Sequence, residues 1–333
     1  MFKYILKRIG ISLLILLGVS FILYALLRCM PTDFVEQKIL QFSAAGNNVT
    51  DEFIQQMYET YGLGDNTFWG ICKGYCTWLG NVCKLDFGRS FINQREVLSE
   101  VFDPDKLGTS FLVAAVATVF EFMIAIPLGI TAATHQYSIR DYVVTVLVLI
   151  GISLPSFFFG QMLKDIFANK LGWFPVSGMK DASLTYANEW EAFIDYIRHM
   201  FLPILTVVVL SIGARMRTTR TNMLEVLNSD YIRTARAKGL KEGKVIYKHA
   251  FRNTMIPVVT SLAGLIPSLF SGAMITESVF DLTGIGSYAL NAMTQGDIPV
   301  IMTYNMFLAF LSVMGVLMAD LMYAVVDPRV KLV

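Results

Sequence analysis

The stretch LGTSFLVAAVATVFEFMIAIPLGITAA, residues Leu107–Ala133, decides the fold because Glu121 is its only charged residue. A helix needs roughly 20 mostly apolar residues to cross a hydrocarbon core of about 30 Å. Five other apolar stretches are candidates for the same role: Ile9–Leu27, Tyr142–Ala168, Met200–Ile212, Met255–Ile275 and Val300–Val326. The pattern predicts an all-α polytopic membrane protein with six transmembrane helices.

The composition agrees with a membrane protein. Of the 333 residues, 55% are hydrophobic and 16% are charged, which is too apolar for an ordinary soluble domain of this length. The formal net charge of +1 gives no reason to expect nucleic acid as a partner. Lys3, Lys7 and Arg8 precede the first apolar stretch, as in a cleavable signal, but the stretch is long for a signal core and no small-residue cleavage site follows it. We therefore expect it to stay in place as the first transmembrane helix.

Positive charge is concentrated between the fourth and fifth predicted helices. The basic residues there are Arg215, Arg217, Arg220, Arg233, Arg236, Lys238, Lys241, Lys244, Lys248 and Arg252. Because short basic loops stay on the cytoplasmic side, this loop and, by parity, both termini are expected in the cytoplasm. The sequence then divides into residues 1–28 with the first helix, an extracytoplasmic cap at 29–106, and a five-helix core at 107–333 whose cytoplasmic loop covers about 216–253. Amphipathic spacing predicts short cap helices near Val49–Tyr61 and Tyr75–Val82.

All four cysteines, Cys29, Cys72, Cys76 and Cys83, lie in or beside the predicted cap. An even number of cysteines on an oxidising face is compatible with one or two disulfides, and equally with buried thiols. A metal site is not expected, because no histidine accompanies the cysteines.

Motifs for catalysis are missing from the sequence. It contains no G-x-x-x-x-G-K-[ST] phosphate loop, no nucleophile elbow and no H-E-x-x-H. The chain is therefore not expected to be an enzyme or to bind a cofactor itself. Glu121 is a candidate for a solute path, since a charge at bilayer depth costs several kcal/mol unless it is paired or hydrated. A contact with a neighbouring subunit, or hydration where a helix bends, would satisfy the same carboxylate.

The most specific segment of the cytoplasmic loop is Asp230–Leu240, DYIRTARAKGL. It predicts a short helix of small and basic residues that ends at Gly239 in the left-handed conformation. Such a helix can project from the membrane and dock in a groove of another protein. It can equally lie on anionic lipid headgroups, a common position for basic helices.

This segment resembles the coupling motif in permease subunits of bacterial ABC importers, in the dipeptide and oligopeptide branch that also handles nickel and glutathione. The resemblance covers nearly the whole chain, through Phe2–Arg8, Tyr61–Leu63, Trp78–Gly80, Ile126–Gly129, Ser153–Phe157, Leu171–Pro175, Thr276–Phe280, Gly284–Gly286 and Asp327–Arg329. It implies the type I importer permease fold, with the insertion after the first helix, in the bacterial inner membrane. The residues that it assigns to contact with the ATPase are Thr234, Ala235, Arg236, Ala237, Lys238, Gly239 and Leu240.

The resemblance also implies the partners. They are a second homologous permease, two ATP-binding subunits that bind ATP and Mg and hydrolyse the ATP, an extracytoplasmic solute-binding protein, and membrane lipid. The substrate it favours is a di- or oligopeptide, with nickel, glutathione and oligosaccharides open. Glu121, Met274 and Glu277 are the candidates for the substrate path.

Two other functions stay open at this stage. An ion-driven secondary transporter would need essential titratable groups inside the membrane and often has inverted repeats. A membrane scaffold that transports nothing would tolerate changes in the segment Asp230–Leu240.

Overall fold

The computed structural model describes residues 2–29, 34–44, 50–60, 67–181, 183–255 and 264–326. Within these ranges the chain is helical and forms no named strand; one isolated antiparallel bridge joins Arg89 and Glu96. The helices before the core are α1 (Phe2–Arg28), α2 (Phe34–Ala44), α3 (Asp51–Thr60), α4 (Phe68–Val82) and α5 (Val97–Val101). The core begins with α6 (Pro104–Thr134), α7 (Ile139–Ser153), α8 (Ser156–Leu163), the π-helical η1 (Lys164–Lys170) and α9 (Glu189–Leu227). It continues with α10 (Asp230–Ala237), α11 (Glu242–Lys244), the π-helical η2 (Val245–Ala250), α13 (Ile266–Ser271), α14 (Met274–Val279), α15 (Ile285–Gln295) and α16 (Ile298–Val326).

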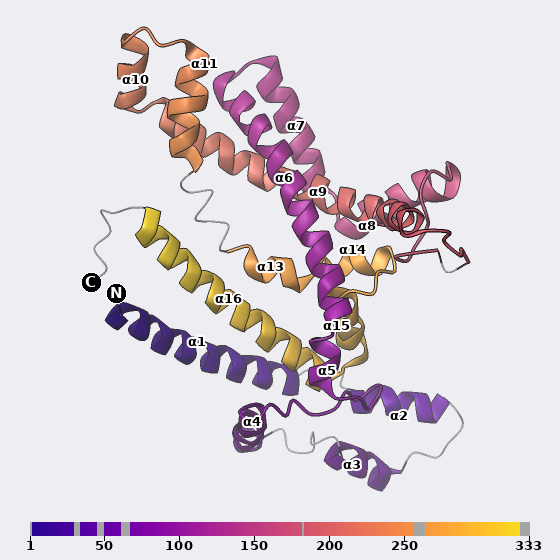
Figure 1. The fold of residues 1–333 in the computed structure, drawn as a ribbon. Coiled ribbons are helices and arrows are strands. Elements are labelled where there is room, and N and C mark those ends of the chain that lie inside the picture. The colour runs from indigo at the N-terminus through magenta and orange to yellow at the C-terminus, as the bar shows by residue number, and fades with distance from the viewer. Residues whose placement is uncertain are drawn as a thin grey trace.

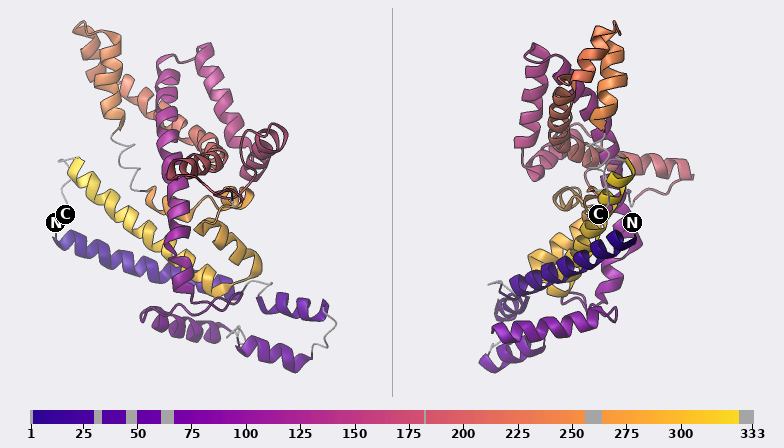
Figure 2. Two further views of the ribbon diagram at one scale, coloured as in Figure 1. Left: turned by 45° about the vertical axis from the view of Figure 1, so that its right-hand side comes forward. Right: turned by 90° about the vertical axis from the view of Figure 1, so that its left-hand side faces the viewer.

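The helices are arranged along α6, which runs through most of the molecule (Figure 1). The short helices α2–α4 lie near the start of α6, whereas α10 and α11 lie near its end, and the two further views agree (Figure 2). α1 and α16 pack side by side and run in opposite directions (Figure 1). The fold therefore has two distinct ends, one with the predicted cap and one with the predicted cytoplasmic loop.

Most of the predicted membrane helices are confirmed as helices. By length and composition alone, four described helices could cross a membrane: Arg8–Arg28, Val97–Thr134, Glu189–Leu227 and Ile298–Ala319. The pair α7 and α8–η1 is a further candidate and bends by 100°. The fifth predicted stretch, Met255–Ile275, includes residues 256–263, which lie outside the described residues.

Two predicted helices differ from the sequence pattern. The stretch Tyr142–Ala168 is not one straight helix, because Pro155 has no N–H to donate and holds Leu154 in an extended conformation, with φ −82° and ψ 128°. The short stretch Met200–Ile212 is part of the 39-residue α9, which continues past Arg215. The pattern ended too early because Arg215 looks like an interfacial charge, yet it is paired inside the protein.

Local sequence signals set the starts of the long core helices. Asp103 caps α6 by accepting from the Asp105 N–H at 2.9 Å, and Pro104 occupies the first turn, where its missing N–H costs nothing. Asn188 caps α9 in the same way, accepting from Glu191 N at 2.9 Å. These caps fix where the two longest core helices begin.

The cap helix α4 is attached to α1. The Tyr75 hydroxyl lies 2.7 Å from Ser20 Oγ and donates to Leu17 O at 3.2 Å, and its ring meets Phe21 edge-on. Of the two predicted cap helices, the one near Val49–Tyr61 is confirmed over its described residues as α3, and the one near Tyr75–Val82 is the second half of α4.

The segment between α4 and α5 is hydrogen-bonded to a residue that lies far along the sequence, just before the last core helix. Asp297, just before α16, accepts from Ser90 Oγ at 2.5 Å and from Phe91 N at 3.1 Å. Because Asp297 is buried, these bonds hold the end of the cap against the start of α16.

Candidate functional site

The helix α10 combines one buried face with one exposed face. Ile232 and Ala235 are buried, while the side chains of Arg233 and Arg236 are exposed. A helix of eight residues is too short to be stable alone, so its packing must hold it in place. It ends as predicted, with Gly239 at φ +74°, a backbone conformation that other L-residues rarely adopt.

The buried face of α10 packs on the ends of three core elements. Its cluster contains Ile130 and Ala133 of α6, Met223 of α9, and Val245 and Ala250 of η2. α10 follows α9 after only Asn228 and Ser229. The position of α10 is therefore set by its packing on η2 and by the buried cluster that it shares with α6 and α9.

An ion pair braces α10 against α11. Arg236 Nη2 donates to Glu242 Oε1 at 2.8 Å, and Arg236 Nε lies 3.2 Å from the same oxygen. The hydrogen bond from Arg236 holds the pKa of the Glu242 carboxyl below its usual range. The pair closes the turn that contains Gly239.

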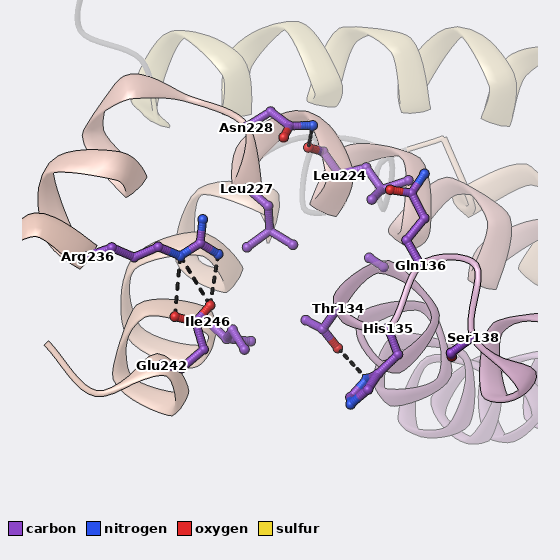
Figure 3. A pocket seen from close by; sticks show the side chains of 11 residues that line it. Thr134, His135, Gln136, Ser138, Leu224, Leu227, Asn228, Arg236, Glu242 and Ile246 are labelled. Carbon is purple, nitrogen blue, oxygen red and sulfur yellow. Dashed lines mark hydrogen bonds and ion pairs between the residues drawn. The ribbon is translucent and has the colours of Figure 1, made fainter.

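A pocket of about 510 Å³ lies between this turn, the end of α9 and the α6–α7 turn (Figure 3). Arg236 and Glu242 line one wall, and Thr134 and His135 line the opposite wall (Figure 3). The Thr134 hydroxyl lies 3.1 Å from His135 Nδ1, and both groups belong to the end of α6. The pocket separates α10 and α11 from the α6–α7 turn on this side of the molecule.

The residues predicted for ATPase contact fall into two groups. Thr234, Arg236, Ala237, Lys238 and Gly239 are exposed, and Leu240 is half-buried at the edge of the apolar cluster. Ala235 differs, because its side chain is buried in the chain's own apolar cluster. Contact with an ATPase stays a prediction for the exposed group.

The carboxylate of Glu121, within the apolar stretch of α6, forms an ion pair inside the protein. Its Oε1 accepts from Arg215 Nε at 3.0 Å, and Arg215 also lies over the Phe122 ring, 4.5 Å from the centroid. The carboxylate therefore joins α6 to α9 in this structure. A role in a substrate path stays a prediction for Glu121, and the cost of its burial is already met within the chain.

Glu277 is fully buried at the junction of α14, α15 and α6. Its Oε1 accepts from the Ser110 hydroxyl at 2.7 Å and from Ala273 N at 3.2 Å, and its Oε2 accepts from Ser287 N at 2.9 Å. A Cβ atom on Gly286 would lie 2.8 Å from Oε2, so the surrounding backbone fits closely around the carboxylate. Glu277 is thus placed to hold this turn to α6, and it does not line an open cavity among the described residues.

Met274, the third predicted path residue, is half-buried at the start of α14. Its side chain packs against the apolar cluster of α5, α15 and α16. The structure does not bring Glu121, Met274 and Glu277 together around one pocket of the described residues.

Sequence reasoning missed a second ion pair of α9. Arg220 donates from Nε to Asp141 Oδ1 at 3.0 Å and from Nη2 to Oδ2 at 2.9 Å. Asp141, at the start of α7, is buried, with 4% of its surface exposed. A signal was present in the sequence: an acidic residue and an arginine at the same end of two predicted neighbouring helices.

The four cysteines are free thiols in the structure, so the one or two disulfides that the sequence left open are not formed in it. Three of them, Cys72, Cys76 and Cys83, lie on or directly after the single helix α4. At about 1.5 Å of rise per residue, Cys83 stands roughly 10 Å along the axis from Cys76, too far for a disulfide.

The sequence is similar to a family of membrane transport components and to two peptide permeases. The sequence model of the family "Binding-protein-dependent transport system inner membrane component" matches residues 125–332. The oligopeptide transport system permease protein AppB of Bacillus subtilis (strain 168) is 37% identical over 99% of this chain and 100% of its own length. The dipeptide transport system permease protein DppB of Alkalihalophilus pseudofirmus is 30% identical over 99% and 100% of the two chains.

A solved structure of the MetNI methionine ABC transporter in inward-facing conformations is also similar. It has a TM-score of 0.49 and 15% identity, and the match covers 67% of this chain and 94% of that chain. The family match extends over more than half of the sequence, and the two relatives align from end to end. The chain is therefore a multi-pass membrane protein that belongs to the family of binding-protein-dependent transport system inner membrane components.

Proposed function

We propose that this chain is one permease subunit of an ATP-driven importer that takes up di- or oligopeptides. The observation that carries the proposal is α10, which is held from inside by Ile232 and Ala235 and exposes basic and small residues at one end of the fold. The peptide substrate is supported by the relatives AppB and DppB, which are named as oligopeptide and dipeptide permeases.

The energy comes from partner subunits in this proposal. Two ATP-binding subunits bind ATP and Mg and hydrolyse the ATP, and this chain is a non-catalytic subunit. The surface that docks on an ATP-binding subunit consists of the exposed part of the predicted segment: Thr234, Arg236, Ala237, Lys238, Gly239 and the edge of Leu240. Ala235 supports that surface from below. A second, homologous permease completes the path for the solute.

The two ends of the fold face opposite compartments in this proposal. The end with α10 lies in the cytoplasm of a bacterium, since basic residues are concentrated there, and both termini of the chain are proposed to face the same compartment. The end with α2–α4 faces outward and receives the solute from an extracytoplasmic binding protein. The long apolar helices contact the lipid of the inner membrane.

The test is affinity capture of the mildly solubilised complex, followed by mass spectrometry. Ala237→Trp adds bulk to an exposed site of α10 without entering the chain's own core, and Lys238→Glu reverses an exposed charge beside it. Lys84→Glu makes the same charge change on the exposed surface just after α4, and it serves as the matched control. We expect wild type and Lys84→Glu to recover a second permease and two ATP-binding subunits, and the α10 variants to lose the ATP-binding subunits only.

Uptake by proteoliposomes then tests the substrate and the energy source. We expect a labelled tripeptide to accumulate only when loaded binding protein is outside and ATP is inside. Accumulation that follows an imposed ion gradient without ATP would contradict the proposal and indicate a secondary transporter. Recovery of the chain alone from wild type would also contradict it.

A further inference from the structure

Two arginines of α9 bind carboxylates on two different helices. Arg215 pairs with Glu121 of α6, and Arg220 pairs with Asp141 at the start of α7. Residues five apart on an α-helix point in directions about 140° apart, so one helix can reach two neighbours in this way. The last turns of α9 are thereby joined to both α6 and α7.

The pair of Arg220 and Asp141 also fixes the turn between α6 and α7. Its two parallel hydrogen bonds form a bidentate contact, which sets orientation as well as distance. Asp141 Oδ2 accepts in addition from Tyr137 N at 3.1 Å, and Tyr137 has a φ of +62°. The carboxylate of Asp141 therefore holds the strained turn and the arginine of α9 at the same time.

Close packing of α6 on α9 lies beside these ion pairs. A Cβ atom on Gly129 would lie 2.7 Å from Thr219 Cβ and 2.9 Å from Met216 O, so the two helices touch through their backbones. Close-packed interfaces transmit strain, and they change between discrete arrangements instead of deforming gradually. The ends of α6, α7 and α9 thus form one block, and α10, packed on η2, shares a buried apolar cluster with α6 and α9 through Ile232 and Ala235.

We propose that Asp141 and Arg220 are positioning residues for energy coupling, which join the ends of α6, α7 and α9 into one rigid block that moves with α10. The proposal rests on the proposed function, because it requires a partner that moves α10. A force on α10 is then passed to three membrane helices together. Without the pair, α10 and α9 can move while α7 and its turn stay behind.

A distance measurement in the assembled complex, with Asp141 and Arg220 unchanged, tests the rigid block directly. Spin labels replace Ile139 in α7 and Arg233 in α10, both exposed, in a background whose four native cysteines are serines. We expect the same distance distribution in the nucleotide-free and ATP-bound states. A distance that changes between these states overturns the proposal, and the result does not depend on whether any ion-pair variant folds.

Variants then test what the pair contributes to transport. Asp141→Asn removes the charge of the pair, Arg220→Lys keeps the charge but not the bidentate contact, and Arg217→Gln removes an exposed arginine from the same helix as a control. In complexes that capture ATP-binding subunits as wild type does, we expect Asp141→Asn to lower peptide uptake per ATP hydrolysed by about fivefold or more. Arg220→Lys should fall between Asp141→Asn and wild type, and Arg217→Gln should match wild type.

The two proposals fail in different ways. Wild-type uptake per ATP in Asp141→Asn, or equal losses of uptake and of ATPase capture, would overturn the positioning role while leaving the proposed function in place. A wild-type chain that captures no ATP-binding subunit would instead overturn the proposed function.

Discussion

The buried carboxylate of Glu277 provides the sharpest test of the structure. The sequence suggested a residue of the substrate path, whereas the structure makes it an internal acceptor for Ser110, Ala273 and Ser287. The substitution Glu277→Gln keeps the shape of the side chain and exchanges one acceptor oxygen for an NH2 group. A structural role therefore predicts loss of stability, and a path role predicts altered transport by a stable protein.

The size of the effect follows from the hydrogen bonds. If the NH2 group takes the place of Oε2, the bond from Ser287 N is lost, at about 1.5–3 kcal/mol for a bond to a charged group. The half-buried N–H of Ser287 is then left without an acceptor in the protein, which costs up to about 1–3 kcal/mol more. Together these terms lower the free energy of unfolding by about 2.5–6 kcal/mol. At about 2–4 °C per kcal/mol for a domain of 150–250 residues, Tm should fall by on the order of 10 °C.

Thermal unfolding of the purified protein in mild detergent measures this effect. Glu96→Gln is the matched control, because it removes the same charge from an exposed side chain just before α5. Surface substitutions of this kind stay within about 0.5 kcal/mol of wild type. If Glu277→Gln unfolds at the wild-type temperature while peptide uptake changes, the structural role is refuted and the path role is supported.

Three further predictions follow from the geometry. Gly129→Ala should lower the free energy of unfolding by about 1–3 kcal/mol, because the added Cβ would meet the backbone of α9. Gly108→Ala on the same helix places its Cβ in open space and should leave Tm unchanged or raise it. Equal Tm values for the two variants would contradict this packing. Arg236 lowers the pKa of the Glu242 carboxyl, so this ion pair stabilises the fold at pH values above the unfolded pKa of about 4.3. The stabilisation is lost as the pH falls through the lowered pKa of the folded state. Glu242→Gln should therefore cost less than about 1 kcal/mol at pH 7, and the difference in Tm between this variant and wild type should vanish in acid. Under non-reducing denaturing conditions, maleimide should add to all four cysteines of the purified protein. Fewer than four adducts in the mass spectrum would indicate that the protein contains a disulfide.

Much of the fold could be predicted from apolar runs, and the exceptions have physical causes. The runs that became α1, α6 and α16 were long and nearly free of charge, so the length of apolar sequence was a sufficient signal. The third run hid a bend of 100°, because hydropathy does not register the missing N–H of Pro155. The fourth was cut short at Arg215, since a count of charges cannot show that its partner lies on another helix.

The site was predictable where the backbone alone decides it. Gly239 was expected in the left-handed conformation from a helix pattern that stops at a glycine, and it has φ +74°. The inward side of α10 was not predicted, because Ala235 is one of several small residues and only tertiary packing shows which of them is buried. Asp141 was missed for the related reason that a carboxylate near a turn looks solvent-exposed in sequence.

The buried carboxylates show why an acid in or directly beside an apolar stretch is a weak sign of a transport path. Glu121 and Asp141 each form an ion pair with an arginine of α9, and Glu277 accepts hydrogen bonds from hydroxyl and amide donors. Each of the three joins elements that are distant in sequence, so removing it would leave donors unpaired at a helix junction. A buried carboxylate is therefore first expected to have a hydrogen-bonding or ionic partner within the protein, and only then a role in binding substrate. For Glu121 and Asp141 the sequence does contain a signal of these partners, because Arg215 and Arg220 follow directly after the fourth apolar stretch.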